Sequence, residues 1–370
     1  MTRPALEARR VRLAFTTVRL YTPSMNGMHK TIMRTDFVVP LFVAVAVCVA
    51  GAQTTYKPPR TAEGRPDLQG VWDFSSLTPL ERPKSMADRA FLTPEEAAAL
   101  TAESAQRKAD ENRPTERKGM LPVGGAVGAY NRFWSDQDAR IALDRRTSII
   151  IDPPDGRLPP LQPGVPHQIG STQQDMPGIG PVRMRGAGIG ADGAEDRGLA
   201  ERCLIGFNSG PPVLPAGYNQ NIQIVQTSDH VMILNEMVHD ARIIPLDGRP
   251  RLPSHVRQWL GEGRGRWEGD TLVVETTNFT DKTASFNPGV ANAVGTGATL
   301  HLTERFRRVA DDNLYYEFTV NDPSTYTRPF TGALSMRRGQ DLYEFACHEA
   351  NYGLANILRG ARVQDSLSQK

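Results

Sequence analysis

The fold of this chain is decided by the stretch Leu300-His-Leu-Thr-Glu-Arg-Phe-Arg-Arg-Val309, Ala310-Asp-Asp-Asn313, Leu314-Tyr-Tyr-Glu-Phe-Thr-Val-Asn321. In both outer parts apolar and polar residues alternate, which is the pattern of a β-strand with one buried face. The link between them is short, so the strands must pair antiparallel, because a parallel crossover needs a dozen or more residues. The stretch therefore predicts a β-hairpin.

The same pattern recurs on both sides of this hairpin. Turn residues join further strands at Ser228-Asp229, Gly269-Asp270 and Arg338-Gly339-Gln340. A long antiparallel meander must hide its edge strands, and closing into a barrel does so. We therefore predict a mainly β fold, an antiparallel meander closing into a lipocalin-like or similar barrel over residues 221–362. Its other strands are predicted at Ile222–Thr227, Val231–Val238, Arg264–Glu268, Thr271–Asn278, Phe330–Arg337 and Asp341–His348.

Residues 53–220 are predicted to contain less regular structure. The chain has 33 Gly and 28 Pro, which favours short strands and many turns. One short surface helix is predicted, because Thr93 can cap it, Pro94 suits its first turn and Glu96 completes a capping box; it should end near Lys108. An extended segment precedes this helix and long Pro/Gly-rich loops follow it. We expect this region to form one domain with the barrel.

Residues 1–52 are interpreted as a leader that ends in a signal peptide. Lys30 and Arg34 precede an apolar run over residues 37–50, and Ala50-Gly51-Ala52 matches the small-x-small rule for cleavage. The run is shorter than the about 20 residues that a membrane span needs. We expect an exported protein, periplasmic or secreted, with no stable membrane span after cleavage. The alternative is an uncleaved membrane anchor.

The cysteines agree with export. Cleavage would remove Cys48 and leave Cys203 and Cys347. Two cysteines in an oxidising compartment predict one disulfide. The alternative is a thiolate metal ligand beside His348.

The charge balance argues against nucleic acid as a partner. The chain has 43 Lys and Arg against 41 Asp and Glu, a formal net charge of +2, and no basic stripe with interleaved aromatic residues. The sequence also lacks a phosphate loop, a nucleophile elbow and a Cys-x-x-Cys pair, and Gly186-x-Gly188-x-Gly190 has no strand before it. We therefore predict no cofactor, and the oligomeric state stays open.

Carboxylates and imidazoles stand where apolar residues would be expected near these strands. Glu304 shares a predicted strand face with Leu302, and Glu236 shares one with Met232. We therefore expect both glutamates to project into a polar pocket inside the barrel. Burying a charge costs free energy unless the charge is paired or used. The candidate catalytic residues are Glu236, His239, Glu304, His348 and Glu349.

Three interpretations of these residues stay open. Ion pairs of Glu236 with Arg242, and of Glu304 with Arg308 or Arg328, would fill the barrel without any chemical role. The second interpretation is general acid–base catalysis on a sugar or another polyhydroxylated molecule.

The third interpretation is a metal site. Glu236 and His239 have suitable ligand types, but on a strand they point to opposite faces. We therefore predict no metal. Polar and aromatic side chains near the same strands are predicted to bind the ligand, with indole rings as flat platforms: Trp72, Trp134, Asn235, Arg242, Trp267 and Tyr352.

Distinctive blocks of sequence occur at Tyr218–Thr227, Asn235-Glu-Met-Val-His-Asp-Ala-Arg-Ile-Ile244, Gly265-Arg-Trp-Glu-Gly-Asp-Thr-Leu-Val-Val-Glu-Thr-Thr-Asn278 and Tyr343–Tyr352. Through them the chain resembles a family of exported bacterial proteins for which no activity is established. The resemblance implies export and a single β-rich domain. Separately, Gly70-x-Trp72 resembles the opening signature of lipocalin barrels, in which the Trp closes one end.

The sequence therefore predicts an exported β-barrel protein with a polar-lined pocket for a small organic ligand, such as a polyhydroxylated molecule. Acid–base catalysis in that pocket, of the hydrolase, lyase or isomerase type, is one expected use. The alternative is a non-catalytic binding or scaffold protein of the cell envelope, with residues 113–220 as its contact surface.

Overall fold

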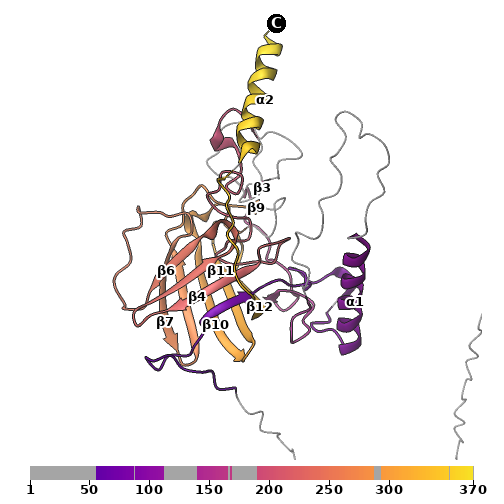
Figure 1. The fold of residues 1–370 in the computed structure, drawn as a ribbon, viewed down its shortest axis with the longest axis vertical. Helices are drawn as coiled ribbons and strands as arrows, with labels where there is room; N and C mark the ends of the chain where they lie inside the picture. Colours follow the sequence, from indigo (N-terminus) through magenta and orange to yellow (C-terminus); the bar gives the residue numbers. More distant parts are fainter. Residues whose placement is uncertain are drawn as a thin grey trace, which may run out of the picture. The chain divides into compact units, whose positions relative to one another are not determined.

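One antiparallel sheet organises the chain and is nearly closed into a barrel (Figure 1). The computed structural model describes residues 56–86, 88–111, 140–165, 167–168, 190–286, 293–349 and 351–369, and Thr55–Lys370 form one compact unit. Residues 1–52, the predicted leader, and Trp134 lie outside the described residues. The strands are β1 (Gly70–Asp73), β2 (Ile150–Asp152), β4 (Asn221–Gln226), β5 (His230–Asn235), β6 (Ala241–Pro245), β7 (Glu262–Glu268), β8 (Thr271–Thr277), β10 (His301–Ala310), β11 (Asn313–Asn321) and β12 (Phe330–Arg338).

The order of strands around the sheet follows their order in the chain. Starting from β1, they are β4, β5 and β6, and then, beyond a seam, β7, β8, β10, β11 and β12, which pairs with β1 again. No backbone ladder joins β6 to β7 within the described chain. β2 adds to β12, and β3 (His167–Gln168) pairs separately with β9 (Ala293–Val294). The predicted mainly β, antiparallel, barrel-like fold is confirmed.

The hairpin predicted from the deciding stretch forms as β10 and β11. Leu302 faces Val320 and Glu304 faces Phe318 across its ladder. The inward residues Leu302, Phe318 and Val320 are fully buried. Burial of each such side chain contributes about 1.5–3 kcal/mol to folding. The apolar interior of the barrel therefore rests on the period-two alternation in the sequence.

Trp72 on β1 is also fully buried. Its indole N–H donates to the Leu68 carbonyl at 2.8 Å, and the guanidinium of Arg338 lies 5.0 Å from its ring centroid. Gly70 has φ +121°, and a Cβ there would lie 2.5 Å from that guanidinium. Both fixed positions of Gly70-x-Trp72 therefore serve the packing of Arg338 onto Trp72. The ring has no free surface for a ligand.

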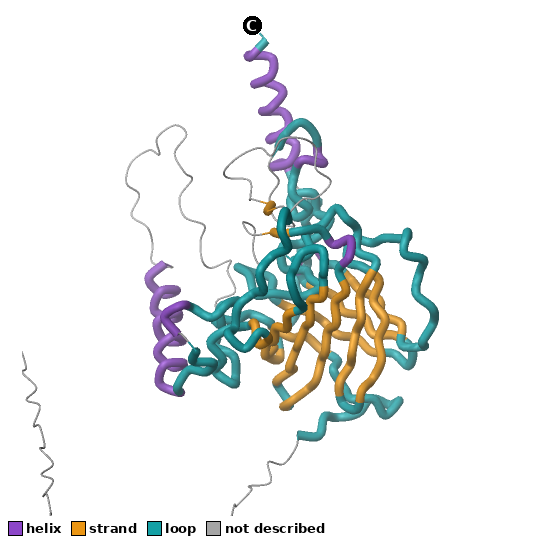
Figure 2. The backbone as a smooth tube through the Cα atoms, turned by 180° about the vertical axis from the view of Figure 1, so that it is seen from behind, coloured by secondary structure: helices purple, strands orange, loops and turns teal. Residues whose placement is uncertain are grey.

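Two strand predictions are wrong. The predicted strand Asp341–His348 is an extended segment without a ladder, because β1 and β2 already occupy the edge of β12. The predicted strand Val231–Val238 ends at Asn235, and a 3₁₀ turn follows at Met237–His239. Long loops join the elements of the sheet (Figure 2).

The predicted surface helix is confirmed as α1 (Pro94–Glu111). Its capping box is formed: the Glu96 N–H donates to Thr93 Oγ1 at 3.2 Å, and the Thr93 N–H donates to Glu96 Oε2 at 2.9 Å. A second helix, α2 (Tyr352–Ser368), follows the disulfide segment and contains no buried residue. In the part of the chain that the structure describes, no helix is long and apolar enough to cross a membrane.

Gly332 on β12 gives a direct test of the core packing. A Cβ at this position would overlap the ring of Phe318, which is fully buried. We expect Gly332→Ala to lower the free energy of unfolding by about 1–3 kcal/mol, the range for overpacked cores, measured by urea unfolding. Gly217→Ala is the control, because nothing lies within 4 Å of a Cβ there. Equal stability of the two variants would contradict this packing.

Candidate functional site

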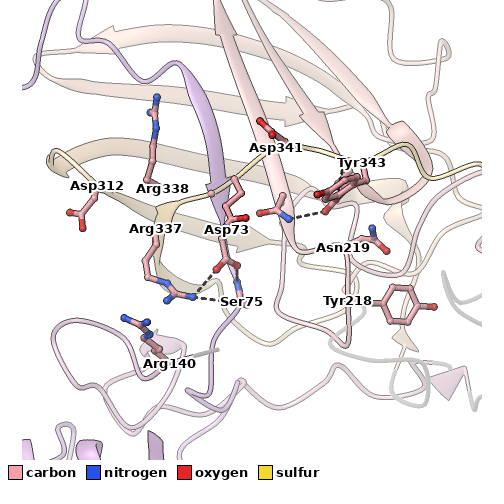
Figure 3. Close-up of a pocket in the computed structure, with 14 residues that line it drawn as sticks. Asp73, Ser75, Arg140, Tyr218, Asn219, Asp312, Arg337, Arg338, Asp341 and Tyr343 are labelled. Atoms are coloured by element: carbon pink, nitrogen blue, oxygen red, sulfur yellow. Dashed lines mark hydrogen bonds and ion pairs between the residues drawn. The ribbon is translucent and has the colours of Figure 1, made fainter. Parts of the chain in front are cut away.

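An open pocket lies at the rim of the barrel, where β1 and β12 end and β4 begins (Figure 3). Its volume is about 640 Å³, within the range of small-molecule sites. The ladder brings its parts together, since Asp73 pairs with both Arg337 and Asn221. We call it the rim pocket. Its lining is Asp73, Ser75, Arg140, Tyr218, Asn219, Asn221, Glu236, Asp312, Arg337, Arg338, Gly339, Gln340, Asp341 and Tyr343.

The sequence predicts a polar pocket inside the barrel, but the rim pocket lies outside the barrel interior. The interior is filled by large apolar side chains such as Trp72, Phe306 and Phe318. Trp72 points inward from β1, and the next residue, Asp73, therefore points to the other face of the sheet. Polar residues at the strand ends form the pocket instead.

Glu236 is the buried acid of the rim pocket, with 5% of its surface exposed. The Asn221 side-chain amide donates to Oε2 at 2.8 Å, and the Tyr343 backbone N–H donates to Oε1 at 3.2 Å. No cation lies within ion-pair distance of this carboxylate among the described residues. A carboxylate can accept about four hydrogen bonds, so acceptor capacity remains for a ligand.

A strained turn places Glu236 there. The Asn235 side chain accepts from the Met237 N–H at 3.0 Å, and Val238 and His239 have φ values of 61° and 47°. Residues other than glycine rarely take this left-handed backbone conformation, and each such residue costs on the order of 1–3 kcal/mol of folding free energy. Glu236 is therefore buried by the turn and not by strand alternation, which corrects the prediction.

The opposite wall of the pocket is an ion pair. Arg337 Nη2 donates to Asp73 Oδ2 at 2.7 Å and lies 3.4 Å from the Ser75 hydroxyl (Figure 3). The Asp73 Oδ1 atom accepts from the Ser75 N–H at 2.8 Å. These contacts hold the Arg337 guanidinium and the Asp73 carboxylate in place at the pocket wall before any ligand arrives.

Residues 339–349, which we call the strap, cover one side of the pocket. The Gly339 N–H donates to the Val71 carbonyl at 2.9 Å, and His239 Nδ1 lies 3.2 Å from the Phe345 carbonyl. Cys347 forms the predicted disulfide with Cys203, with a Cα–Cα distance of 5.7 Å. Because the strap has no ladder, these few contacts and the disulfide fix it.

Glu304 has a different environment. It is fully buried, and Arg242 on β6 donates two hydrogen bonds to it, Nη1 to Oε2 at 2.5 Å and Nη2 to Oε1 at 3.1 Å. The Tyr316 hydroxyl donates to Oε1 at 2.8 Å. Burial, followed by the Glu304 charge, raises the pKa of Tyr316 well above its ordinary value, so the phenol keeps its proton. The prediction that Arg308 or Arg328 pairs with Glu304 is wrong, because the partner is Arg242.

The other predicted site residues are spread over the structure. His239, His348 and Glu349 are exposed, and Tyr352 begins α2 with 71% exposure. Asn235 and Arg242 are held by the contacts described above. Trp267 packs against the barrel core. Of the five predicted catalytic residues, the structure brings only Glu236 into the rim pocket.

Sequence reasoning missed most of the pocket. Asp73, Asn221 and Arg337 come together only because β1 lies between β4 and β12. A usable signal was present, since polar residues cluster at the strand ends in Tyr218-Asn-Gln-Asn221 and Arg337-Arg338. Among the described residues, no group of three or more His, Cys, Asp or Glu side chains could hold a metal ion.

Comparison with known proteins adds no family. No family model matches the chain, and no curated protein or solved structure matches it. The resemblance of the Asn235–Ile244 and Gly265–Asn278 blocks to a family of exported proteins therefore stays a prediction. The function has to be argued from the geometry of the rim pocket.

Replacing each buried glutamate by its isosteric amide separates their roles. Glu304→Gln leaves Arg242 buried without a counter-charge, so we expect a loss of roughly 3–5 kcal/mol in the free energy of unfolding. Glu236→Gln disturbs two hydrogen bonds with neutral donors, and we expect a loss of only about 1 kcal/mol. Urea unfolding followed by circular dichroism measures both. Similar losses would contradict the different environments.

The disulfide should control the strap. We expect Cys347→Ser to lower the free energy of unfolding by about 2–4 kcal/mol, because the bridge closes a long loop. Limited proteolysis should also cut residues 339–349 faster than in the wild type. Reductant should bring the wild type to the level of the variant and leave the variant unchanged. Wild-type protein that is insensitive to reductant would refute this role.

Proposed function

We propose that this protein binds a small polyhydroxylated molecule, such as a sugar, in the rim pocket. The observation that carries the proposal is Glu236, a buried carboxylate at the pocket wall that has two neutral donors and, among the described residues, no cation as a partner. Its remaining lone pairs suit ligand hydroxyl groups, which donate hydrogen bonds. A ligand without donors would leave this carboxylate poorly solvated, which costs free energy.

The rest of the lining also suits hydroxyl groups. Each hydroxyl both donates and accepts, and the pocket offers both partners at short range: carboxylates such as Asp341 accept, and the amides of Asn219 and Gln340 do both. Tyr218 and Tyr343 add aromatic rings with a polar end. A hydroxyl-rich ring presents the same mixture of apolar faces and polar edges.

The charge of the lining argues against phosphate-rich ligands. Arg140, Arg337 and Arg338 face Asp73, Glu236, Asp312 and Asp341, so carboxylates outnumber guanidinium groups. Arg337 is already engaged by Asp73. Phosphate binding needs an excess of cationic or N–H donors, so a neutral ligand fits this pocket better.

Export belongs to the same proposal. The apolar run over residues 37–50, followed by a small-x-small site, supports a signal peptide. The Cys203–Cys347 pair at disulfide distance agrees with an oxidising compartment. The protein would then meet its ligand in the periplasm or outside the cell.

Acid–base catalysis is the second candidate function. Glu236 favours it, because a carboxylate with free lone pairs at the wall of a ligand pocket can take a proton from a bound hydroxyl group. Liquid chromatography with mass spectrometry of the bound compound after incubation tests it, because the chromatography also separates isomers of equal mass. A product that forms with the wild type and is lost in Glu236→Gln, while binding persists, would establish catalysis; an unchanged compound would leave binding alone.

The binding proposal is tested with a panel of neutral sugars and sugar alcohols, screened by thermal shift and measured by calorimetry. We expect Tyr343→Ala to weaken the affinity for a hit about tenfold, which corresponds to one lost contact of ~1.4 kcal/mol. Tyr352→Ala is the matched control, because Tyr343 and Tyr352 are 76% and 71% exposed and only Tyr343 lines the pocket. If no polyhydroxylated compound binds, or both variants bind equally, the proposal is wrong.

A further inference from the structure

A second open pocket lies beside the seam of the barrel. It is lined by β6, by the start of β7 and by the loop between them, and its volume is about 780 Å³. We call it the seam pocket. It shares no lining residue with the rim pocket, although Glu236 of the rim pocket and Asp240 of the seam pocket lie on the same turn.

Side chains fill part of the seam itself. A Cβ at Gly265 on β7 would lie 2.6 Å from Leu246 and 2.9 Å from Ile244. The side chains of Ile244 and Leu246 therefore pack directly over the backbone of β7. An added peptide strand would have to displace them, so the seam is a poor place for strand addition. Because strand addition is disfavoured, a small molecule fits the seam pocket better than a peptide strand does.

Part of the lining of the seam pocket is apolar. Ile243 and Leu252 are 58% and 40% exposed, and Trp259 and Leu260, which also line the pocket, are half-buried. Apolar side chains gathered at a pocket in this way are a common sign of a ligand site. The rim pocket differs, since its lining is polar apart from its tyrosines and Gly339.

The polar lining of the seam pocket includes four arginines and the carboxylates Asp240 and Glu262. Three of its arginines are already paired with carboxylates: Arg242 with Glu304, Arg249 with Asp247 and Arg264 with Glu262. Arg257 differs, because its Nη1 donates to the carbonyls of Phe279 at 2.8 Å and Ala298 at 2.9 Å. Within the described residues it has no carboxylate partner. The guanidinium is thus fixed in place while its charge stays unneutralised.

We propose that the seam pocket binds an anionic amphiphile, a molecule with one carboxylate on a short apolar body. The carboxylate takes the open donors of Arg257, whose charge-assisted hydrogen bonds are the strongest that the pocket offers. The apolar body lies on Ile243, Leu252, Trp259 and Leu260. This site is independent of the rim pocket and of the function proposed for it.

Octanoate is the probe, and titration calorimetry measures its affinity for the purified protein. We expect octanoate to bind, and octanol and acetate to bind at least about tenfold more weakly, because each lacks one half of the recognised chemistry. Octanol that binds as tightly as octanoate, or octanoate that does not bind, would overturn the proposal.

Variants locate the site. Arg257→Gln should weaken octanoate binding about tenfold or more, the usual effect of losing a charged hydrogen-bond partner. Arg107→Gln on α1 is the control with the same charge change, and its affinity should stay within about twofold. Unchanged binding in Arg257→Gln would contradict the assignment.

A second pair of variants does not depend on the backbone contacts of Arg257. Ile243 is exposed, so its replacement should leave the fold intact. Ile243→Asp places a negative charge in the seam pocket, and Ile243→Asn places a polar group of the same size there. We expect the Asp variant to bind octanoate several-fold more weakly than the Asn variant, with the difference shrinking at high salt. Equal affinities of the two variants would count against a site that binds the ligand's carboxylate through a positive charge.

Discussion

One buried ion pair, Arg242 with Glu304, links the two ends of the sheet. β6 and β7 share no backbone ladder within the described chain, so the two ends of the sheet need another connection. Arg242 on β6 reaches past the seam to Glu304 on β10, and Tyr316 on β11 completes the contact. The Tyr316 hydroxyl also accepts from the Val213 N–H at 3.3 Å, which ties a loop to the same network. Removing two charges from water is costly, and the paired hydrogen bonds together with the tyrosine offset that cost.

The dense interior around this pair decides where pockets can form. Trp72, Phe306 and Phe318 are fully buried in one apolar core, so the rim pocket and the seam pocket lie outside that core. The rim pocket forms where the strands end in polar residues, and the seam pocket forms where the ladder is missing. The turn from Asn235 to Asp240 lies between them and holds residues of both. Val238 and His239 in this turn have left-handed backbone conformations, which are strained. In folded proteins such strained residues cluster at functional sites.

The sequence predicted those features that depend on neighbours along the chain. The β10–β11 hairpin, the inward position of Glu304 and the capping box of α1 all follow from local patterns, and all are present. Features that depend on distant contacts were missed. Arg242 could not be assigned to Glu304 because 62 residues separate them. The alternation in the strap predicts a strand, because nothing in the local sequence shows that β1 and β2 occupy the edge of β12. The disulfide was predictable because only two cysteines, Cys203 and Cys347, follow residue 52.

Glu236 and Glu304 show why residue type alone does not reveal a site. Both are glutamates that the fold buries, and both accept hydrogen bonds at each carboxylate oxygen. Glu304 has a guanidinium and a phenol, so its charge and lone pairs are used within the protein and its role is to hold the sheet closed. Glu236 has one amide and one backbone N–H, at the wall of an open pocket. A carboxylate gains most from new donors where existing donors are few and neutral. The difference in partners therefore assigns stability to Glu304 and supports our proposal that Glu236 recognises a ligand.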